Sequence, residues 1–458
     1  MSKLPPWLAP ALAYITDWLG HQMRVTGQPG CAIAIAYQGR IVLETAFGHA
    51  DLGKSEKLTP RHRFRVASHS KSFTAAGIMK LREQRRLKVD DPAGHYVKGL
   101  HPDIASATIA QLLSHTAGIF RDGTDCAYWV DRAPFSDAAR LRKDLKLPPA
   151  IEANTRLKYS NHGFALAGLV IEAVTGEPYV DWIAREIVNP AGLAETTPDM
   201  PLPAKAKFAR GHGTKTLLGR RLVFPGDRST HALAAATGFV STAGDLAKFF
   251  SQLSPNAKTS VLSVASRREM TRPQWRDAYS ALPLSYGLGT ISGVLDGWSW
   301  FGHSGGFQGY ITRTAAVPAE DLAISVLTNA VDGQSHFWLD GALQILKRFK
   351  AEGAPTRATK DWTGRWWSVW TATDLVAMGD KVLLASPDWP NPFLKVPELA
   401  VTSRDEARIA QAGSFHSYGE PVRRIRGKDG KVSALRVAGG KMVPEDVLVK
   451  EVTARYES

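Results

Sequence analysis

Two pairs of strand-like runs, each pair joined by a short turn, constrain the fold of this chain more than any other feature of its sequence. The runs are 31–37 and 40–47, with Gln38-Gly39 between them, and 309–317 and 322–328, with Pro318-Ala319 in the turn. Connections this short join antiparallel strands, because parallel neighbours need a crossover of a dozen or more residues. The sequence therefore predicts an antiparallel sheet built from hairpins.

Helical patterns lie on both sides of these hairpins. Over 10–26, apolar residues recur at the spacing of an amphipathic helix. Further helices are predicted at 71–87, 108–116, 163–175 and 335–349. Thr242 and Asp245 have the spacing of a helix-capping pair and predict a helix start there. An antiparallel sheet combined with helices places the chain in the α+β fold class.

The composition changes after residue 350. The segment 351–360 (AEGAPTRATK) is rich in Pro, Gly and Thr and is typical of a linker. Strand-like runs dominate beyond it, and a Lys428-Asp429-Gly430 turn within 424–437 predicts a further hairpin. We therefore expect a first domain over 1–350, the linker 351–360, and a small all-β, barrel-like domain over 361–458.

The positive charge of the chain is concentrated in its first part. Lys and Arg number 57 and Asp and Glu 43, which gives a formal charge of +14. Residues 361–458 contain 14 basic and 13 acidic residues, so +13 belongs to 1–360. No nucleic-acid recognition motif accompanies the basic segments 61–65 and 80–88, and we expect solvated surfaces there and no nucleic-acid partner.

Membrane, export and metal signals are missing from the sequence. The strongest apolar stretch, 163–174, is interrupted by Glu172 and is shorter than the roughly 20 residues that a membrane span needs. The first residues do not have the pattern of a signal peptide. Cys31 and Cys126 are too few for a disulfide framework, a zinc ribbon or an iron–sulfur site. We expect a cytoplasmic protein with no membrane partner, no metal and no cofactor.

The first candidate site is Ser68-His69-Ser70-Lys71, an S-x-x-K sequence at the start of the predicted helix 71–87. Residues three apart lie on one face of a helical turn, so the Lys71 amine would lie beside the Ser68 hydroxyl. A serine hydroxyl is a weak nucleophile and needs an adjacent base, and the helix dipole would favour a developing alkoxide. Lys71 can act as that base only where burial or nearby charge lowers its pKa from about 10.4. The alternative is an N-capping serine followed by a solvated lysine.

Two further motifs carry groups that complement this pair. Tyr159-Ser160-Asn161 offers a hydroxyl that can relay a proton and an amide that can hold a lysine or a carbonyl. The segment 302–306 (GHSGG) has small residues that would let a substrate lie along a strand, with a backbone N–H directed at an oxyanion. The structural alternatives are a packed tyrosine with a helix-capping asparagine, and a glycine-rich turn.

In this order, S-x-x-K, Y-x-N and H-x-G resemble the serine β-lactamase and penicillin-binding-protein superfamily. The resemblance is greatest to the class C β-lactamase-like branch, which includes esterases, D-aminopeptidases and D-amino-acid amidases. It covers about residues 18–349, and it extends to the segments 112–119 (LLSHTAGI), 159–168 (YSNHGFALAG), 236–249 (ATGFVSTAGDLAKF) and 302–310 (GHSGGFQGY). It implies a β-lactamase/transpeptidase-like fold, an antiparallel sheet flanked by helices plus a helical subdomain.

The resemblance also implies roles for individual residues. Ser68 matches the acylated nucleophile, Lys71 and Tyr159 the general base and acid, and Asn161 the substrate-orienting amide. The N–H groups of Ser68 and Gly306 would form the oxyanion hole, with Ser304 and Gly305 on the same substrate-binding strand. The implied reaction is acylation, departure of an amine or alcohol, and hydrolysis of the acyl-enzyme.

His303 departs from many family members, which carry a lysine at this position. Histidine has a reference pKa near 6.5 and is mostly uncharged at neutral pH, so it should attract a substrate carboxylate less than lysine would. This favours small-molecule esters, amides or short peptides, including D-amino-acid types. A β-lactamase or D-Ala-D-Ala carboxypeptidase of the same fold is the alternative.

Two further alternatives stay open on the sequence. The segment 302–306 also fits G-x-S-x-G, the nucleophile elbow of α/β-hydrolases, which would make Ser304 the nucleophile. A catalytically idle scaffold or binding protein on the same fold is the non-enzyme alternative.

The domain over 361–458 resembles the lipocalin-like domains of some D-aminopeptidases, which implies a lid or a contact within a homodimer. A module that serves stability alone is the other interpretation.

Overall fold

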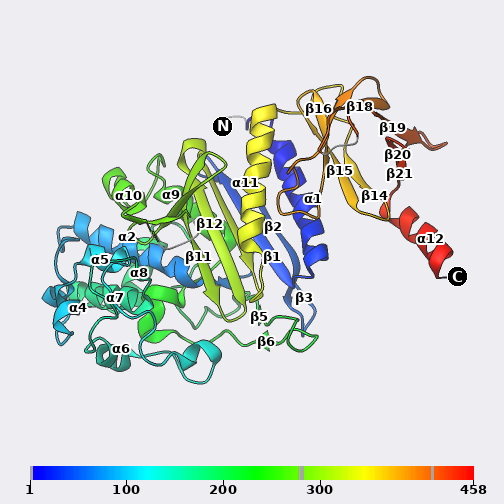
Figure 1. Cartoon of the computed structure of the whole chain (residues 1–458). Coiled ribbons are helices and arrows are strands. Elements are labelled where there is room, and N and C mark those ends of the chain that lie inside the picture. The colour runs from blue at the N-terminus through cyan, green and yellow to red at the C-terminus, as the bar shows by residue number, and fades with distance from the viewer. Residues whose placement is uncertain (1–3, 277, 279–282, 414–416, 458) are drawn as a thin grey trace. The chain divides into compact units, whose positions relative to one another are not determined.

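The computed structural model describes residues 4–276, 278, 283–413 and 417–457. The chain divides into two compact units, a larger one of residues 28–339 and a smaller one that combines residues 1–27 with 340–458 (Figure 1). The first helix and most of the helix from Ser335 therefore group with the C-terminal strands, whereas the sequence analysis assigned both to the first domain. The domain boundaries at 350 and 361 stay a prediction.

The larger unit is built on an antiparallel sheet of nine strands, counted over the described residues. Their order across the sheet is β3 (Glu56–Lys57), β2 (Arg40–Asp51), β1 (Gly30–Tyr37), β13 (Leu322–Thr328), β12 (Tyr310–Val317), β11 (Trp298–Phe307), β10 (Ile291–Leu295), β9 (Ser285–Tyr286) and β8 (Trp275–Arg276). Both predicted hairpins are confirmed as β1–β2 and β12–β13. They pair with each other through β1 and β13, so segments almost 300 residues apart form the centre of the sheet.

Helices form a second layer in the larger unit, at the left of Figure 1. They are α2 (Ser70–Glu83), α3 (Ala93–Tyr96), α4 (Pro102–Ser106), α5 (Ile109–Leu113), α6 (Ala138–Asp144), α7 (Asn161–Thr175), α8 (Tyr179–Ile183), α9 (Ala243–Leu253) and α10 (Val264–Thr271). The predicted capping pair is present, because Thr242 accepts a hydrogen bond from the Asp245 N–H at the start of α9. Helix α2 ends earlier than predicted because Arg85 adopts a left-handed conformation, which stops a helix.

Aromatic stacking fixes α2 within this layer. The ring of Phe73 lies between Phe239 and Phe249, at centroid distances of 4.3 and 4.0 Å. All three rings are fully buried. Because α2 begins beside Ser68, this packing also fixes the position of the candidate nucleophile.

The smaller unit contains α1 (Leu8–Thr26), most of α11 (Ser335–Glu352) and an eight-stranded antiparallel sheet. The strands are β14 (Gly364–Trp367), β15 (Ala372–Met378), β16 (Lys381–Ala385), β17 (Glu398–Val401), β18 (Glu406–Gln411), β19 (Pro421–Arg426), β20 (Val432–Val437) and β21 (Gly440–Met442). Backbone hydrogen bonds between Trp367 and Val443 nearly close the sheet into a barrel, as predicted. The predicted hairpin around Asp429 is β19–β20.

The chain after this sheet differs from the expected all-β domain. Residues Glu445–Tyr456 form helix α12. Pro444 precedes it, and Glu445 and Asp446 lie in its first turn, where carboxylates interact favourably with the helix dipole. These start signals are present in the sequence, but they follow a long series of strand-like runs, which led to the prediction of an all-β domain.

Across the residues that the structure describes, no helix combines the length and the apolarity needed to cross a bilayer.

Candidate active site

Ser68 lies in a short 3-10 turn, Ala67–His69, that leads directly into α2. Ala67 has a φ of +47°, a left-handed conformation that is uncommon outside glycine and that clusters at functional sites. The buried Ser70 hydroxyl donates to the Ala67 carbonyl and accepts from the Phe239 N–H at 3.0 Å, which holds the turn in place. Ser68 itself is half-buried and is presented at the N-terminus of the helix.

The Lys71 amine is fully buried and has three oxygen atoms around it. Its Nζ lies 3.0 Å from Ser68 Oγ, 2.7 Å from Asn161 Oδ1 and 2.8 Å from the Ala236 carbonyl. A neutral amine has two N–H groups and one lone pair. If the N–H groups donate to the amide and carbonyl oxygens, the lone pair is left to accept the Ser68 proton.

Burial favours that neutral form. Desolvation holds the pKa of Lys71 well below its usual range, and the Arg121 guanidinium lowers it further, while the Asp122 carboxylate opposes both. Lys71 needs such a shift of its pKa to act as a base. The cation that helps to lower the pKa of Lys71 is the guanidinium of Arg121.

The Tyr159 hydroxyl is the second group on the Ser68 oxygen. It donates a hydrogen bond to Ser68 Oγ at 2.7 Å. Burial raises the pKa of Tyr159, so its hydroxyl keeps its proton at neutral pH. The Lys71 amine lies 4.8 Å from the centre of the same ring. The Ser68 hydroxyl thus lies beside a potential proton acceptor, the Lys71 amine, and a potential proton donor, the Tyr159 hydroxyl.

Asp122 orients the amide of Asn161 and was missed in the sequence. Asn161 begins α7, and its Nδ2 donates to Asp122 Oδ1 at 2.6 Å, which turns Oδ1 toward Lys71. Trp129 Nε1 donates to the same carboxylate oxygen at 3.1 Å, and Arg121 Nε lies 3.1 Å from its other oxygen. These residues come from an irregular loop, and no local pattern marks an orienting carboxylate there.

His303 lies in β11 and is buried, with 2% of its surface exposed. Its Nε2 lies 2.8 Å from the Tyr286 hydroxyl and its Nδ1 2.7 Å from the Ser304 carbonyl. Burial, with His69 and Lys71 nearby, holds the pKa of His303 well below its usual value. The ring is therefore uncharged at neutral pH. No feature of the sequence indicates Tyr286 as its partner.

The small residues of β11 approach the turn that carries Ser68. A Cβ atom on Gly305 would lie 2.2 Å from the Val66 carbonyl oxygen, so only glycine fits there. Gly306 is exposed, and Ser304 is half-buried within the strand opposite Arg313 of β12. Ser304 therefore does not occupy the strand-to-helix turn of a nucleophile elbow, and that alternative is wrong.

Within the basic segment 61–65, the expected solvated surface is found at Arg61 but not at Arg65. Arg61 is exposed and forms an ion pair with Glu195 at 2.7 Å. Arg65 is fully buried, donates to the Gly226 carbonyl at 2.9 Å and lies 3.4 Å from the Asp199 carboxylate. The expectation fails for Arg65 because a carbonyl and a carboxylate distant in the sequence surround its side chain.

Comparison with known proteins adds independent observations. The beta-lactamase family model matches residues 15–344. Protein flp of Staphylococcus aureus (strain MW2) is 29% identical over 184 residues, which are 39% of this chain and 36% of that protein. The chain thus matches only about a third of the length of the first curated relatives.

Two solved structures resemble the chain over most of its length. The octameric penicillin-binding protein homologue from Pyrococcus abyssi has a TM-score of 0.66 and 22% identity, covering 94% of this chain and 99% of that one. The D-amino acid amidase from Ochrobactrum anthropi SV3, complexed with L-phenylalanine amide, has a TM-score of 0.61 and 23% identity, covering 74% and 96%. At these identities the likeness concerns the fold.

Proposed function

Since the chain belongs to the beta-lactamase family, we propose that it is a serine hydrolase that forms an acyl-enzyme on Ser68. The observation that carries this proposal is the hydrogen-bonded cluster in which the Ser68 hydroxyl meets both the buried Lys71 amine and the Tyr159 hydroxyl. A nucleophile, a base with a lowered pKa and a second proton-transfer group within hydrogen-bond distance are the parts that acyl transfer requires.

The proposed acylation step follows from these contacts. Ser68 Oγ attacks the substrate carbonyl carbon while its proton passes to the Lys71 lone pair. The negative charge that develops on the carbonyl oxygen is stabilised by the N–H groups of Ser68, at the N-terminus of α2, and of Gly306 in β11. Lys71 and Tyr159 then return a proton to the leaving amine or alcohol. Water hydrolyses the Ser68 ester and restores the free hydroxyl.

Substrates that do not rely on a carboxylate for binding fit the surroundings of His303 best. A neutral, buried imidazole that is hydrogen-bonded to Tyr286 offers no cation to a substrate carboxylate. We therefore propose esters, amides or short peptides, including D-amino-acid amides, as the substrate class. The likeness to a D-amino acid amidase supports this choice. A β-lactamase or carboxypeptidase is the second candidate, supported by the likeness to a penicillin-binding protein homologue.

Covalent labelling tests the nucleophile. A fluorescent phosphonate should react with wild-type protein and Ser304→Ala but not with Ser68→Ala, and mass mapping should locate the adduct on Ser68. Ser304→Ala is the matched control, because Ser304 is also half-buried and lies on the proposed substrate strand. Labelling that disappears in Ser304→Ala and persists in Ser68→Ala would overturn the assignment. Failure of wild type to react with the phosphonate or to turn over p-nitrophenyl esters would favour an idle scaffold.

A substrate panel tests the proposed class. We expect hydrolysis of p-nitrophenyl esters or amino-acid p-nitroanilides in preference to nitrocefin. Comparing D- and L-amino-acid p-nitroanilides assigns the stereochemistry. Efficient nitrocefin turnover with no ester or anilide hydrolysis would identify a β-lactamase instead.

Self-association is the remaining part of the proposal. We propose a homodimer, and the octameric state named for the Pyrococcus abyssi protein supports self-association in a protein of similar fold. Light scattering coupled to size-exclusion chromatography measures the mass of the particle. A single species at 49.8 kDa, the mass of one chain, would contradict a dimer.

A further inference from the structure

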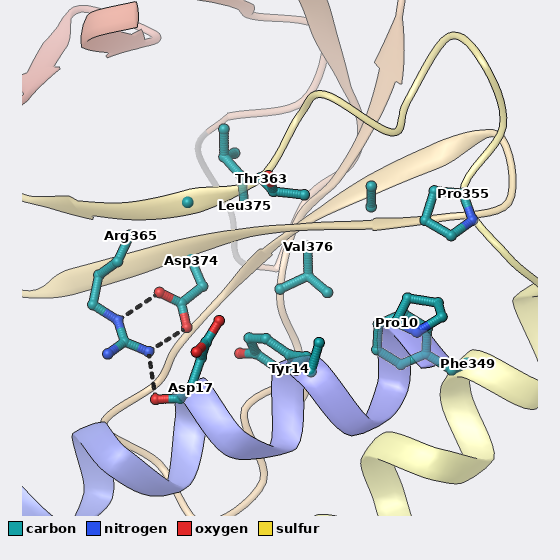
Figure 2. A pocket seen from close by; sticks show the side chains of 13 residues that line it. Pro10, Tyr14, Asp17, Phe349, Pro355, Thr363, Arg365, Asp374, Leu375 and Val376 are labelled. Carbon is teal, nitrogen blue, oxygen red and sulfur yellow. Dashed lines mark hydrogen bonds and ion pairs between the residues drawn. The ribbon is translucent and has the colours of Figure 1, made fainter. Parts of the chain in front are cut away.

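A cavity of about 420 Å³ lies within the smaller unit, between α1 and the strands β14 and β15 (Figure 2). This volume is in the range of small-molecule sites. Side chains on a strand alternate between its two faces. On β15, Leu375 and Ala377 belong to the hydrophobic core of the barrel-like sheet, so Asp374 and Val376 point from the other face. Both line the cavity, as do Leu375 and Ala377.

One end of the cavity is polar and carries more acid than base. Asp374 is 4% exposed and pairs with Arg365, whose Nε and Nη2 donate to its two carboxylate oxygens at 2.7 and 2.8 Å. Asp17, on α1, adds a second carboxylate at the mouth of the cavity. Within the described part of the chain, the Asp17 carboxylate forms no ion pair. The hydrogen bond that Arg365 donates to Asp17 goes to the backbone carbonyl, at 3.4 Å, and not to the carboxylate.

The Tyr14 hydroxyl is the second feature of this end. Tyr14 is 9% exposed, and no group among the described residues meets its hydroxyl at full hydrogen-bond geometry, although burial raises its pKa and the Asp374 carboxylate lies close enough to raise that pKa further. Figure 2 shows this hydroxyl pointing toward the polar end, with the Asp17 and Asp374 side chains beside it. Burying a hydroxyl without a well-formed hydrogen bond is unfavourable, so the oxygen of this group is available to accept a hydrogen bond from a ligand.

The opposite end is apolar. Pro10, Phe349, Pro355 and Val376 line it, as Figure 2 shows. The Tyr14 ring is stacked on Phe393 at a centroid distance of 5.5 Å, which fixes the ring between the two ends. A ligand that fits both ends has an apolar body and one polar head.

The geometry points to an organic ammonium ion, a protonated amine on an apolar body, as the ligand of this cavity. Two carboxylates face one guanidinium, so a cation restores charge balance and an anion would add to the imbalance. The ammonium N–H groups would donate to the Asp17 carboxylate and to the Tyr14 oxygen, while the body lies against Phe349 and Val376. This site lies outside the Ser68 cluster, and the proposal does not depend on acyl transfer.

Calorimetric titration of the full chain with 2-phenylethylamine tests the proposal, with 3-phenylpropanoate and 2-phenylethanol as probes of similar shape. We expect the amine to bind and the anion and the alcohol to bind at least about tenfold more weakly. Asp17→Asn should weaken amine binding about tenfold and Tyr14→Phe by a smaller factor. Asp446→Asn, an exposed carboxylate on α12, is the matched control and should bind like wild type.

Two further measurements separate this cavity from the Ser68 cluster. Ser68→Ala should bind 2-phenylethylamine as tightly as wild type, whether or not the chain proves to be a hydrolase. Val376→Trp should abolish binding by filling the cavity, and its melting temperature reports whether it folds. Equal affinity in wild type and Asp17→Asn, equal affinity for the alcohol, or no binding at millimolar amine would each overturn the proposal.

Discussion

The buried amine of Lys71 links the electrostatics of single residues to the proposed chemistry. Burial and Arg121 lower its pKa, and Asp122 raises it. In the proposed mechanism the neutral amine is the active base, so kcat/KM should rise with pH as Lys71 loses its proton and then level off. Arg121→Gln removes a cation and should move this limb to higher pH, whereas Asp122→Asn removes an anion and should move it to lower pH. We expect shifts of roughly 0.3 to 1 pH unit.

The pH profile of ester hydrolysis measures these shifts. Arg142→Gln is the control, since Arg142 is also an exposed arginine and has no place in the cluster. Its profile should coincide with that of wild type. If all four profiles coincide, or if the Arg121 and Asp122 variants shift in the same direction, Lys71 is not the group that titrates.

Local geometry explains which parts of the candidate site could be predicted from the sequence. Ser68 and Lys71 are three residues apart, and a helical turn alone brings their side chains to 3.0 Å. Asp122 and Asn161 are 39 residues apart, and their contact depends on the path of an irregular loop that no periodicity describes. Tyr286 reaches His303 only through the pairing of β9, β10 and β11.

At the scale of elements, β11 must approach the turn before Ser68 without a side chain between them. Gly305→Ala would place a Cβ 2.2 Å from the Val66 carbonyl oxygen and force strand and turn apart. We expect a loss of about 1–3 kcal/mol in the free energy of unfolding and a fall in kcat/KM of at least about tenfold.

The neighbouring glycine provides the control for this variant. At Gly306 the nearest atom to an added Cβ is Ile311 Cδ1, at 3.8 Å, and alanine keeps the backbone N–H. Gly306→Ala should therefore unfold at the wild-type denaturant midpoint. Equal unfolding midpoints for the two variants would show that the close approach of Gly305 to Val66 does not exist in solution.

The elements that the sequence predicted are those with a long pattern. Strands β1, β12 and β13 each have seven or eight residues, nearly all apolar in β1 and β13, and their hairpins followed from the turns between them. The two-residue strands β8 and β9 have no period to detect. Helix α12 has start signals, but its polar and apolar residues are not separated onto opposite faces and none of them is buried, so no apolar face marked it as a helix.

At the scale of the whole molecule, the two compact units do not follow chain order, because α1 groups with the C-terminal strands. Within the smaller unit, Trp18 Nε1 donates to the Trp389 carbonyl at 3.2 Å, and Gln22 Nε2 donates to the Pro387 carbonyl at 2.6 Å. The His21 ring pairs with Asp388 at 2.6 Å. These contacts make the first helix part of the structural support of the last domain, although more than 300 residues separate them.

Two buried tryptophans allow each unit to be destabilised separately. Trp18 in the smaller unit and Trp182 in the larger unit are both almost fully buried. Replacing either by alanine should cost about 3–5 kcal/mol, through lost burial and the cavity left behind. Trp182 belongs to the hydrophobic core of the larger unit, and Trp18 packs against Gly341 and Trp389 of the smaller one, so we expect the cost to fall on the unit that contains the substitution. Hydrogen exchange read by mass spectrometry measures this locally. Trp18→Ala should speed exchange in peptides of β15 and β16 and leave α7 protected, and Trp182→Ala should do the reverse. Equal acceleration in both sets of peptides for both variants would show instead that the chain unfolds as one cooperative body.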